Sequence, residues 1–401
     1  MDGPDGQGAL RALRQRNRAQ IIEVLRNAGT ASRAEIARLT GLSRTTVSSV
    51  VAELNDSGLI AETPTPADAP AAGRGRPGVL LSLQPSAGAA VGIDFGHTHL
   101  RVAIADLSSR VLAEHHRRLD VDRAADVALD AAVEMLDEVL EESGTARGRI
   151  AGVGVGLPGP LDRASGTVGS AVILPGWAGL QPAAELERRL ALPIMVDNDA
   201  NLGALAENAV GAGRGFSDIV YLKLSSGIGA GLILGGRLHH GATGMAGEIG
   251  HVLSNPDGLV CRCGNRGCLE TVAAGPALLD LLRVSHGESL DTADLLRLAS
   301  EGDVGVRRVF ADAGRSLGRA LADLVNAVNP GRIVVGGELS EVGDPLLDGI
   351  RTSIDRYALP AAAAALEVVP GVLGDRAEVL GAVALVISDT GRLSSGHLSA
   401  V

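Results

Sequence analysis

The sequence predicts two kinds of structure in succession, a winged helix-turn-helix domain and then a larger α/β region. Residues 1–84 contain three closely spaced helical patterns with capping residues, followed by two short apolar strands. From residue 85 onward, apolar strand-like runs alternate with amphipathic helices, which is typical of an α/β protein. The length of 401 residues is enough for two or three domains with sizeable cores.

Three helices are expected at the N-terminus. Residues 16–27 carry apolar side chains at helical spacing. Ser32 and Glu35 fit a capping box for a second helix, which breaks at Gly41. Ser43 can then cap a third helix.

A helix, a glycine-containing turn and another helix form the helix-turn-helix pattern, in which the later helix lies in a DNA groove. The outward side of that helix carries short hydrogen-bonding groups suited to base edges and phosphates. We therefore expect DNA contacts from Arg44, Thr45, Thr46 and Ser48. An ordinary three-helix bundle is the alternative.

A wing is expected after the third helix. Residues 59–62 and 79–83 are strand candidates, and the Pro/Ala/Gly-rich segment between them contains Arg74 and Arg76. Arginines on such a segment can enter a narrow A·T-rich minor groove, and a solvated linker is the alternative. Residues 1–80 hold ten arginines and eight acidic residues, which gives a net charge of +2. Because the whole chain has a net charge of −11, the remaining residues carry −13. The N-terminal segment is therefore the part electrostatically suited to DNA.

The composition is that of a soluble globular protein, with 46% apolar and 21% charged residues. No window approaches the roughly 18 consecutive apolar residues of a membrane span, and the N-terminus lacks a signal-peptide pattern. A cytoplasmic protein without membrane contact is therefore expected. Lys223 is the only lysine, and we interpret this scarcity as a general preference of the chain for arginine.

The α/β region places three small-residue turns next to predicted strands. The strands 91–94 and 100–105 flank the first turn, 220–224 and 231–234 flank the second, and 332–335 precedes the third. Such a turn can face a phosphate or an adenine, and an aspartate in it can position Mg²⁺. The candidate nucleotide-loop residues are Asp94, Gly96, Thr98, Gly227, Gly229, Gly336 and Gly337. The remaining predicted elements are helices at 123–142 and 306–328, strands at 150–156 and 194–196, and a helix from residue 200.

A metal site is expected from the cysteines. All three cysteines fall within eight residues, and His251 precedes them. His251, Cys261, Cys263 and Cys268 together form a Cys₃His set, which is a structural zinc arrangement. Three free buried thiols are the alternative.

The order and spacing of the three turns resemble the two phosphate loops and the adenosine loop of the actin-like ATPase fold. The most specific motif is Gly250-His251 followed, after nine residues, by Cys-x-Cys-Gly-x-x-Gly-Cys-x-Glu. On these motifs the sequence resembles the ROK family of repressors, open reading frames and sugar kinases, over nearly the whole chain. The resemblance implies a winged helix-turn-helix domain and a two-lobed, actin-like (ribonuclease H-like) sugar-kinase fold. The implied units are the DNA-binding domain at 1–84, a small lobe at 85–200 joined by the C-terminal helix 376–390, a large lobe at 201–375 with a zinc loop at 251–270, and a flexible tail at 391–401.

The resemblance also implies a sugar site. Carboxylates and amides suit sugar hydroxyls, which both donate and accept hydrogen bonds. In the kinase members, the residue aligned with Asp199 is the general base that takes the proton from the attacking hydroxyl. From local pattern alone, Asn198-Asp199 also fits a helix cap, and Glu248 and Glu270 also fit solvated loop charges. The implied sugar-binding residues are Asn198, Asp199, Glu248, His251 and Glu270.

Three residues depart from the kinase pattern. His97 replaces the second glycine of the first loop, His99 replaces its lysine, and Ser225 stands where kinases have the first glycine of the second loop. A side chain at a position of close backbone approach obstructs contact with a phosphate. The departures therefore argue against bound ATP and Mg²⁺, while the sugar and zinc sites are complete.

Two functions from different classes follow. The first is a sugar-responsive transcriptional regulator, in particular a repressor of carbohydrate-utilisation genes, that acts as a dimer or tetramer on operator DNA. The second is an ATP-dependent, glucokinase-like sugar kinase, alone or in a bifunctional protein, with Asp199 as its catalytic base. A regulator controlled by a docked transport protein instead of free sugar is a third possibility.

Overall fold

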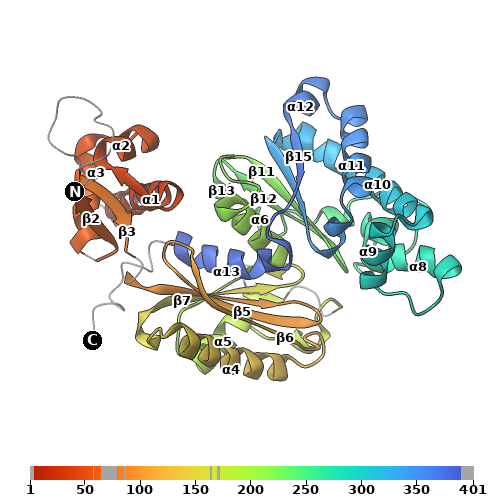
Figure 1. Cartoon of the computed structure of the whole chain (residues 1–401), viewed down its shortest axis with the longest axis horizontal. Coiled ribbons are helices and arrows are strands. Elements are labelled where there is room, and N and C mark those ends of the chain that lie inside the picture. The colour runs from red at the N-terminus through yellow and green to blue at the C-terminus, as the bar shows by residue number, and fades with distance from the viewer. Residues whose placement is uncertain are drawn as a thin grey trace.

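A computed structural model of the chain describes residues 4–56, 58–64, 79–84, 87–162, 165–168 and 172–389. These residues form an N-terminal domain that lies beside the first of two α/β lobes (Figure 1). Arg74, Arg76 and the predicted tail at 391–401 lie outside the described residues. Among the described helices, none is both long enough and apolar enough to cross a membrane.

The N-terminal domain combines three helices with a sheet of strand order β1-β3-β2. Ser32 and Glu35 form the predicted capping box, and Gly41 ends the second helix at a φ of 71°, a conformation that favours glycine. The Ser43 hydroxyl accepts a backbone N–H in the first turn of the third helix, as predicted. The elements are α1 (Pro4–Ala28), β1 (Thr30–Ser32), α2 (Arg33–Thr40), α3 (Arg44–Asp56), β2 (Ile60–Pro64) and β3 (Val79–Leu83).

The small lobe is a five-stranded sheet of order β10-β7-β4-β5-β6 with helices on both faces. In Figure 1, α4 and α5 cover its lower face and α13 lies along its upper face. Glycines let α13 approach closely, because a Cβ on Gly154 would lie 2.0 Å from the Ala382 carbonyl oxygen. Its elements are β4 (Ala89–Phe95), β5 (His99–Asp106), β6 (Val111–Arg118), α4 (Ala125–Ser143), β7 (Ile150–Leu157), α5 (Pro182–Leu190), β10 (Ile194–Asn198) and α13 (Ala377–Ser388), with the short pair β8 (Leu161–Asp162) and β9 (Thr167–Val168).

The large lobe contains a second five-stranded sheet, of order β13-β12-β11-β14-β15. Alternate residues of its central strand point to opposite faces, as a pleated strand requires. Val220 and Leu222 join the apolar core that includes Phe310 of α10, whereas Tyr221 packs with Ala204 of α6. Its elements are α6 (Asp199–Val210), β11 (Ile219–Leu224), β12 (Ile228–Leu234), β13 (Arg237–Leu238), α7 (Glu270–Ala273), α8 (Gly275–His286), α9 (Thr292–Ser300), α10 (Val304–Val328), β14 (Arg332–Gly336), α11 (Asp344–Tyr357), α12 (Pro360–Ala365) and β15 (Glu367–Pro370).

One strand boundary differs from the sequence prediction. The second small-residue turn was expected to last until residue 231, but β12 already begins at Ile228. Gly227 lies in the turn as predicted, but Gly229 and Gly231 are strand residues under α6. A Cβ on Gly231 would lie 2.5 Å from the Ala200 carbonyl oxygen, and one on Gly229 would lie 3.1 Å from the Ala200 side chain. Close helix packing, and not a turn, explains why these positions are small.

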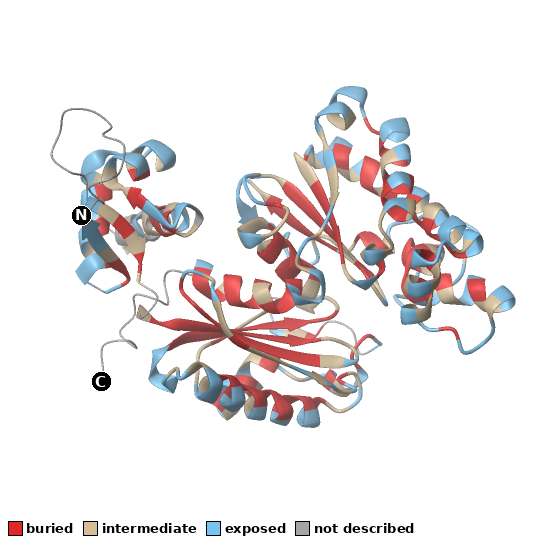
Figure 2. Cartoon of the chain, viewed as in Figure 1, coloured by how far each residue is buried: buried red, intermediate tan, exposed pale blue. Residues whose placement is uncertain are grey.

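The two lobes meet where α6 of the large lobe crosses α13 of the small lobe. Contact is close, because a Cβ on Gly381 would lie 1.9 Å from the Leu202 carbonyl oxygen. The central strands of both sheets are buried, whereas the edge strands β6, β13 and β15 are partly exposed (Figure 2). The core of the N-terminal domain, with Leu81 and Leu83, belongs to one continuous apolar cluster that also includes Val386 and Ile387 near the end of α13. The helix α13 therefore packs against both lobes, and its last turn belongs to the cluster that includes the N-terminal core.

Candidate functional site

A polar cleft is lined by all five residues predicted to bind a sugar. Large-lobe and small-lobe residues both line it, so the cleft lies between the lobes. The five predicted lining residues are Asn198, Asp199, Glu248, His251 and Glu270. The other lining residues are His97, Pro158, Gly159, Ile173, Lys223, Ser225, Ser226, Gly227, Ile228, Gly229 and Arg262.

Asn198 and Asp199 stand at the junction of β10 and α6. Asn198 is the helix N-cap, and its side-chain oxygen accepts the N–H groups of Ala200 and Asn201. The alternative that the sequence left open, a helix cap, therefore describes part of what Asn198 does. Its amide nitrogen also donates to the Gly159 carbonyl at 2.9 Å, which ties the cap to the small-lobe wall of the cleft. The helix start thus fixes both side chains at the cleft.

Glu248 and His251 belong to the loop that precedes the cysteines. The Nε2 atom of His251 lies 3.8 Å from the Glu248 carboxylate, while its Nδ1 atom faces the thiol of Cys261 at 3.6 Å. Burial, followed by the charges of Asp199 and Glu270, raises the pKa of Glu248 to about 7. These two distances show that Nδ1 of His251 faces the cysteines, while Nε2 lies toward the cleft carboxylate of Glu248.

Arg262 is a cleft residue that the sequence analysis did not single out. Its guanidinium forms two hydrogen bonds with Glu270, at 2.7 Å from Nε and 2.9 Å from a terminal nitrogen. Glu270 is buried, and its other contact is a long one, 3.4 Å from the Ile228 N–H. Two parallel bonds fix the orientation of a carboxylate. A Cβ on Gly227 would lie 2.7 Å from the same guanidinium, so the second glycine loop makes room for it.

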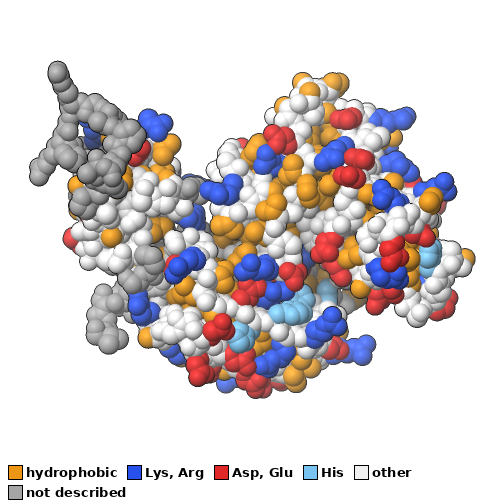
Figure 3. All heavy atoms as spheres, viewed as in Figure 1, with side chains coloured by type: hydrophobic (Ala, Val, Ile, Leu, Met, Phe, Trp, Pro, Cys, Tyr) orange, Lys and Arg blue, Asp and Glu red, His pale blue; other side chains and the backbone are white. Residues whose placement is uncertain are grey.

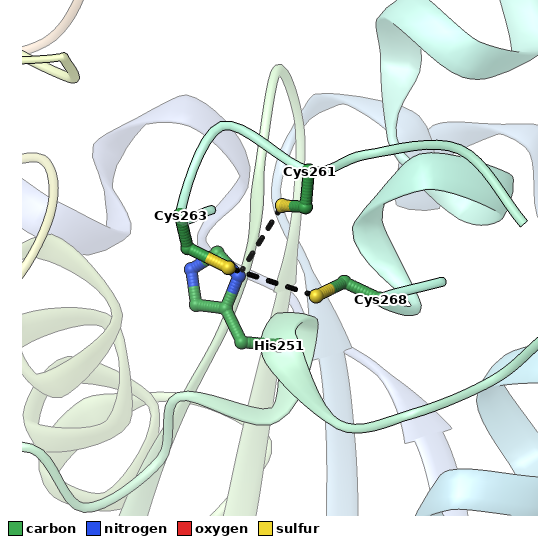
Figure 4. A group of neighbouring side chains, drawn as sticks. All are labelled: His251, Cys261, Cys263 and Cys268. Carbon is green, nitrogen blue, oxygen red and sulfur yellow. Dashed lines mark hydrogen bonds between the residues drawn. The ribbon is translucent and has the colours of Figure 1, made fainter. Parts of the chain in front are cut away.

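The predicted metal ligands are gathered in one place (Figure 4). The ligand atoms of His251, Cys261, Cys263 and Cys268 all lie within 4.8 Å of one another. The Cys263 and Cys268 sulfurs are 3.7 Å apart. Three thiolates and one imidazole at these separations suit a tetrahedral metal ion. The cluster can therefore hold a metal next to the cleft, because His251 belongs to both.

His97 contributes to the small-lobe wall of the cleft. Its Nδ1 atom is hydrogen-bonded to the Asp122 carboxylate at 2.7 Å, which fixes the ring. The sequence identified His97 as an obstruction to phosphate contact, and the structure also places it among the residues around the sugar site. A carboxylate that orients an imidazole also sets which ring nitrogen carries a proton.

The Asp94 carboxylate, expected near a nucleotide-bound Mg²⁺, is paired inside the protein. It is 2% exposed, and one of its oxygens lies 2.9 Å from Nε2 of His99. Burial lowers the pKa of His99, but the hydrogen bond and charge of Asp94 raise that pKa above its usual value overall. A Cβ on Gly96 would lie 2.1 Å from the His99 ring, and Thr98 is exposed at the turn. The histidine that stands where kinases have lysine thus occupies the first loop itself.

Lys223 is the second cleft residue that sequence analysis did not assign. Its ammonium lies 2.9 Å from Asp199 and 2.9 Å from Glu378 at the start of α13. Burial alone would lower its pKa, but the charges of Asp199, Glu378 and Asp94 raise the pKa of Lys223 well above its usual value. A charged residue in an otherwise apolar strand was the available signal, and its status as the only lysine sharpens that signal.

The two parts of the chain match known families. Residues 90–389, which include the whole cleft, match the model of the ROK family. The chain belongs to the ROK family. Residues 15–69, which include α2 and α3, match the model of the MarR family. The ROK fold and its N-terminal winged helix domain thus agree with the architecture predicted from the sequence.

Both repressors and sugar kinases are among the proteins similar to this chain. A putative xylose repressor of Caldicellulosiruptor sp. (strain Rt8B.4) is 32% identical over 390 residues, covering 94% of this chain and 96% of that protein. A glucokinase of Halalkalibacterium halodurans is 32% identical over 322 residues, covering 77% of this chain and 97% of that protein. The crystal structure of a ROK family transcriptional regulator, a homologue of the E. coli MLC protein, has a TM-score of 0.79 at 27% identity and covers 96% of this chain and 100% of its own. The repressor-type relatives therefore include the N-terminal domain.

The adenosine-loop glycines of the ROK fold have packing roles in this chain. A Cβ on Gly336 would lie 2.4 Å from the Tyr221 hydroxyl. Gly337 has a φ of 80°, and its Cβ would lie 2.4 Å from the Leu224 carbonyl oxygen. The absence of side chains here is explained by contacts within the protein and needs no nucleotide.

The predicted DNA contacts from α3 lie at the surface of the N-terminal domain. Arg44, Thr45 and Ser48 are exposed. Thr46 is half-buried, and its hydroxyl is 2.8 Å from that of Ser43, so it contributes to the helix start. The exposed set is therefore available to a groove or a phosphate.

Proposed function

We propose that this chain is a sugar-responsive, DNA-binding transcriptional regulator that represses carbohydrate-utilisation genes. The observation that carries the proposal is the combination, in one chain, of an exposed helix α3 with a sugar cleft whose nucleotide-side carboxylate is paired internally. The buried Asp94 is hydrogen-bonded to His99 through one carboxylate oxygen, whereas Glu248 and His251 of the predicted sugar set line the cleft. A repressor needs the sugar and the operator, and it does not need phosphoryl transfer.

The DNA-binding surface in this proposal is the exposed side of α3. Arg44, Thr45 and Ser48 would contact bases and phosphates, with Thr46 supporting the helix start and the wing arginines Arg74 and Arg76 reaching the minor groove. Figure 3 shows acidic and basic side chains interspersed over the presented face of the two lobes, which is unlike a DNA-binding surface. The regulator would act in the cytoplasm as a dimer or tetramer, so that two α3 helices meet two half-sites.

Zinc is the metal that the Cys₃His cluster would hold. Three thiolates and one imidazole, with ligand atoms within 4.8 Å of one another, fit a closed structural zinc site. When bound, zinc would crosslink the loop that carries Glu248, His251, Arg262 and Glu270. The zinc would have a structural role only, and the loop side chains that line the cleft would bind the sugar.

Fluorescence anisotropy with labelled DNA from the chain's own upstream region tests the DNA half. We expect specific binding that a neutral sugar, an N-acetyl amino sugar or one of their phosphates weakens. Arg44→Ala should cost about 1–3 kcal/mol of DNA affinity, whereas Arg351→Ala, which changes a half-buried arginine on α11, should cost nothing measurable. No specific binding at moderate salt would refute the proposal.

An ATP-dependent sugar kinase is the second candidate, because Asp199 lines the cleft and the chain is 32% identical to a glucokinase. Against it, Asp199 already accepts a hydrogen bond from Lys223 at 2.9 Å, so a sugar hydroxyl would have to share the carboxylate with that ammonium. A coupled assay of ADP release with the same sugars discriminates the two. Turnover that Asp199→Asn abolishes would establish the kinase.

A further inference from the structure

Lys223 lies between the two lobes. It is the only lysine of the chain, and it occupies β11. Along this strand Val220 and Leu222 face the core under α10, while Tyr221 faces α6. By the period of two in a strand, Lys223 is on the same side as Tyr221 and therefore faces α6 and α13, where the lobes meet.

The ammonium of Lys223 joins a sugar-binding residue to the first turn of α13. Asp199 offers it one carboxylate oxygen, while its other oxygen accepts the N–H of Ala200. Glu378, which is 5% exposed, also lies 2.9 Å from the ammonium. Breaking a buried ion pair by removing one member leaves an uncompensated charge, so the three groups behave as one unit. The charges of Asp199, Glu378 and Asp94 raise the pKa of Lys223, so the ammonium keeps its charge, while burial raises the pKa of Glu378.

The helix that begins beside this unit ends beside the DNA-binding domain. It has 12 residues and is about 18 Å long. Val386 and Ile387 in its last turn belong to the apolar cluster that continues into the core of the N-terminal domain through Leu81 and Leu83. Glu378 and Ile387 therefore mark the two ends of one rigid element, with the sugar cleft at one end and the DNA-binding domain at the other.

We propose that Lys223 is the residue that couples the two ends: it positions Asp199 for a sugar hydroxyl and ties Asp199, through Glu378, to α13. This inference rests on the proposed function and names its regulatory connection. A hydroxyl that donates to Asp199 shares the carboxylate with Lys223, so sugar binding changes how strongly the ammonium holds Glu378. Sugar can then shift the equilibrium between two positions of α13 by its difference in affinity for them.

Glu378→Gln is the variant that separates binding from coupling. It removes the charge that ties Lys223 to α13 but leaves every cleft residue in place. For the wild-type chain we expect sugar to change DNA affinity by about 5- to 150-fold, the usual range of allosteric coupling. For Glu378→Gln we expect Asp199 to keep its hydrogen bond from Lys223, so that sugar still binds, and we expect a coupling factor close to 1. Unchanged coupling would overturn the proposal.

Substitutions of Lys223 itself test the positioning of Asp199. Lys223→Met should weaken sugar binding by about 10-fold or more, because a charged hydrogen bond to Asp199 is lost. Lys223→Arg keeps the charge and should recover most of the affinity. The matched control is Arg101→Met, which removes another buried cation paired with two carboxylates, Glu114 and Asp375, outside the cleft. A loss of sugar affinity in the control as large as in Lys223→Met would assign Lys223 a structural role only.

A sugar-free measurement keeps this inference separate from the proposed function. Because Lys223 is the only lysine, the full chain grown with ¹³C-lysine gives one lysine side-chain signal in the NMR spectrum. We expect that signal to show no titration up to the ordinary lysine pKa of about 10.4, and to shift in both Asp199→Asn and Glu378→Gln. If either variant left the signal unchanged, the proposed pairing of Lys223 with both Asp199 and Glu378 would be wrong. Absence of DNA binding or of any sugar response would instead refute the proposed function.

Discussion

The two sides of the cleft use their polar groups in opposite ways. On the sugar side, Glu248 and His251 line the cleft, and so do Asp199 and Glu270, although Lys223 and Arg262 already pair with these two carboxylates. On the nucleotide side, Asp94 is paired with His99 within the protein. A polar group that faces a cleft can exchange water for a ligand, whereas one already paired must first lose its partner. The contrast indicates which side of the cleft is more accessible to a ligand.

Removal of the metal should produce the largest effect on the sugar side. In Cys263→Ser we expect the zinc content to fall from about one per chain to a small fraction, measured by metal analysis. Sugar affinity should fall by on the order of 100-fold, because His251 and the loop around Arg262 lose their anchor. Chelation of the wild-type chain should reproduce the loss, and added zinc should reverse it. A variant that retains its sugar response without zinc would contradict the coupling of metal to cleft.

Arg262→Met should give the next largest effect. It leaves the buried Glu270 carboxylate with one long contact, the N–H of Ile228 at 3.4 Å. We expect sugar affinity to fall by about 1–3 kcal/mol, measured by calorimetry, while zinc content stays at the wild-type level. Arg266→Met is the matched control, since Arg266 lies in the same loop and donates to the Gly258 carbonyl. Equal losses in both variants would mean that general loop disruption, and not the orientation of Glu270, is responsible.

The same contrast explains what the sequence could predict. The Cys₃His cluster and the capping box of Ser32 and Glu35 follow from local spacing, because their members are close in the chain. The role of Lys223 does not, because Glu378 comes from a distant helix that only the fold brings near. From the sequence alone, the single lysine was interpreted as a consequence of the chain's general preference for arginine.

Glycines were the weakest guide for a related reason. A glycine predicts a conformation or a close approach but does not say what approaches. Gly229 and Gly231 suggested a phosphate-binding turn, whereas α6 fills the space beside them. Gly336 likewise makes room for Tyr221. The fold class survived these errors because strand and helix alternation does not depend on the identity of the neighbour.

The pairing of His99 predicts a small pH effect on the nucleotide side. Its pKa in the folded chain is raised, so the pair contributes stability that is fully present below the ordinary histidine pKa and is lost as pH rises through the raised value. The effect is small, because His99 is one-third exposed and solvent screens the pair. Melting temperatures measured across this interval should fall slightly more in wild type than in His99→Gln. A steeper fall in His99→Gln would show that Asp94 does not hold the ring.

Mg²⁺-ATP should produce no effect at all, which makes it the strictest test of the contrast. A ligand at 100 times its dissociation constant stabilises a protein by about 2.7 kcal/mol, which a thermal-shift measurement detects easily. We expect no shift with Mg²⁺-ATP or its non-hydrolysable analogue, because the His99 ring occupies the first loop and Lys223 is already held by Asp199 and Glu378. A sugar that stabilises the same sample provides the positive control. A saturable shift with nucleotide would mean that internal pairs of this kind yield to a ligand, and the division of the cleft into a binding side and a closed side would then be wrong.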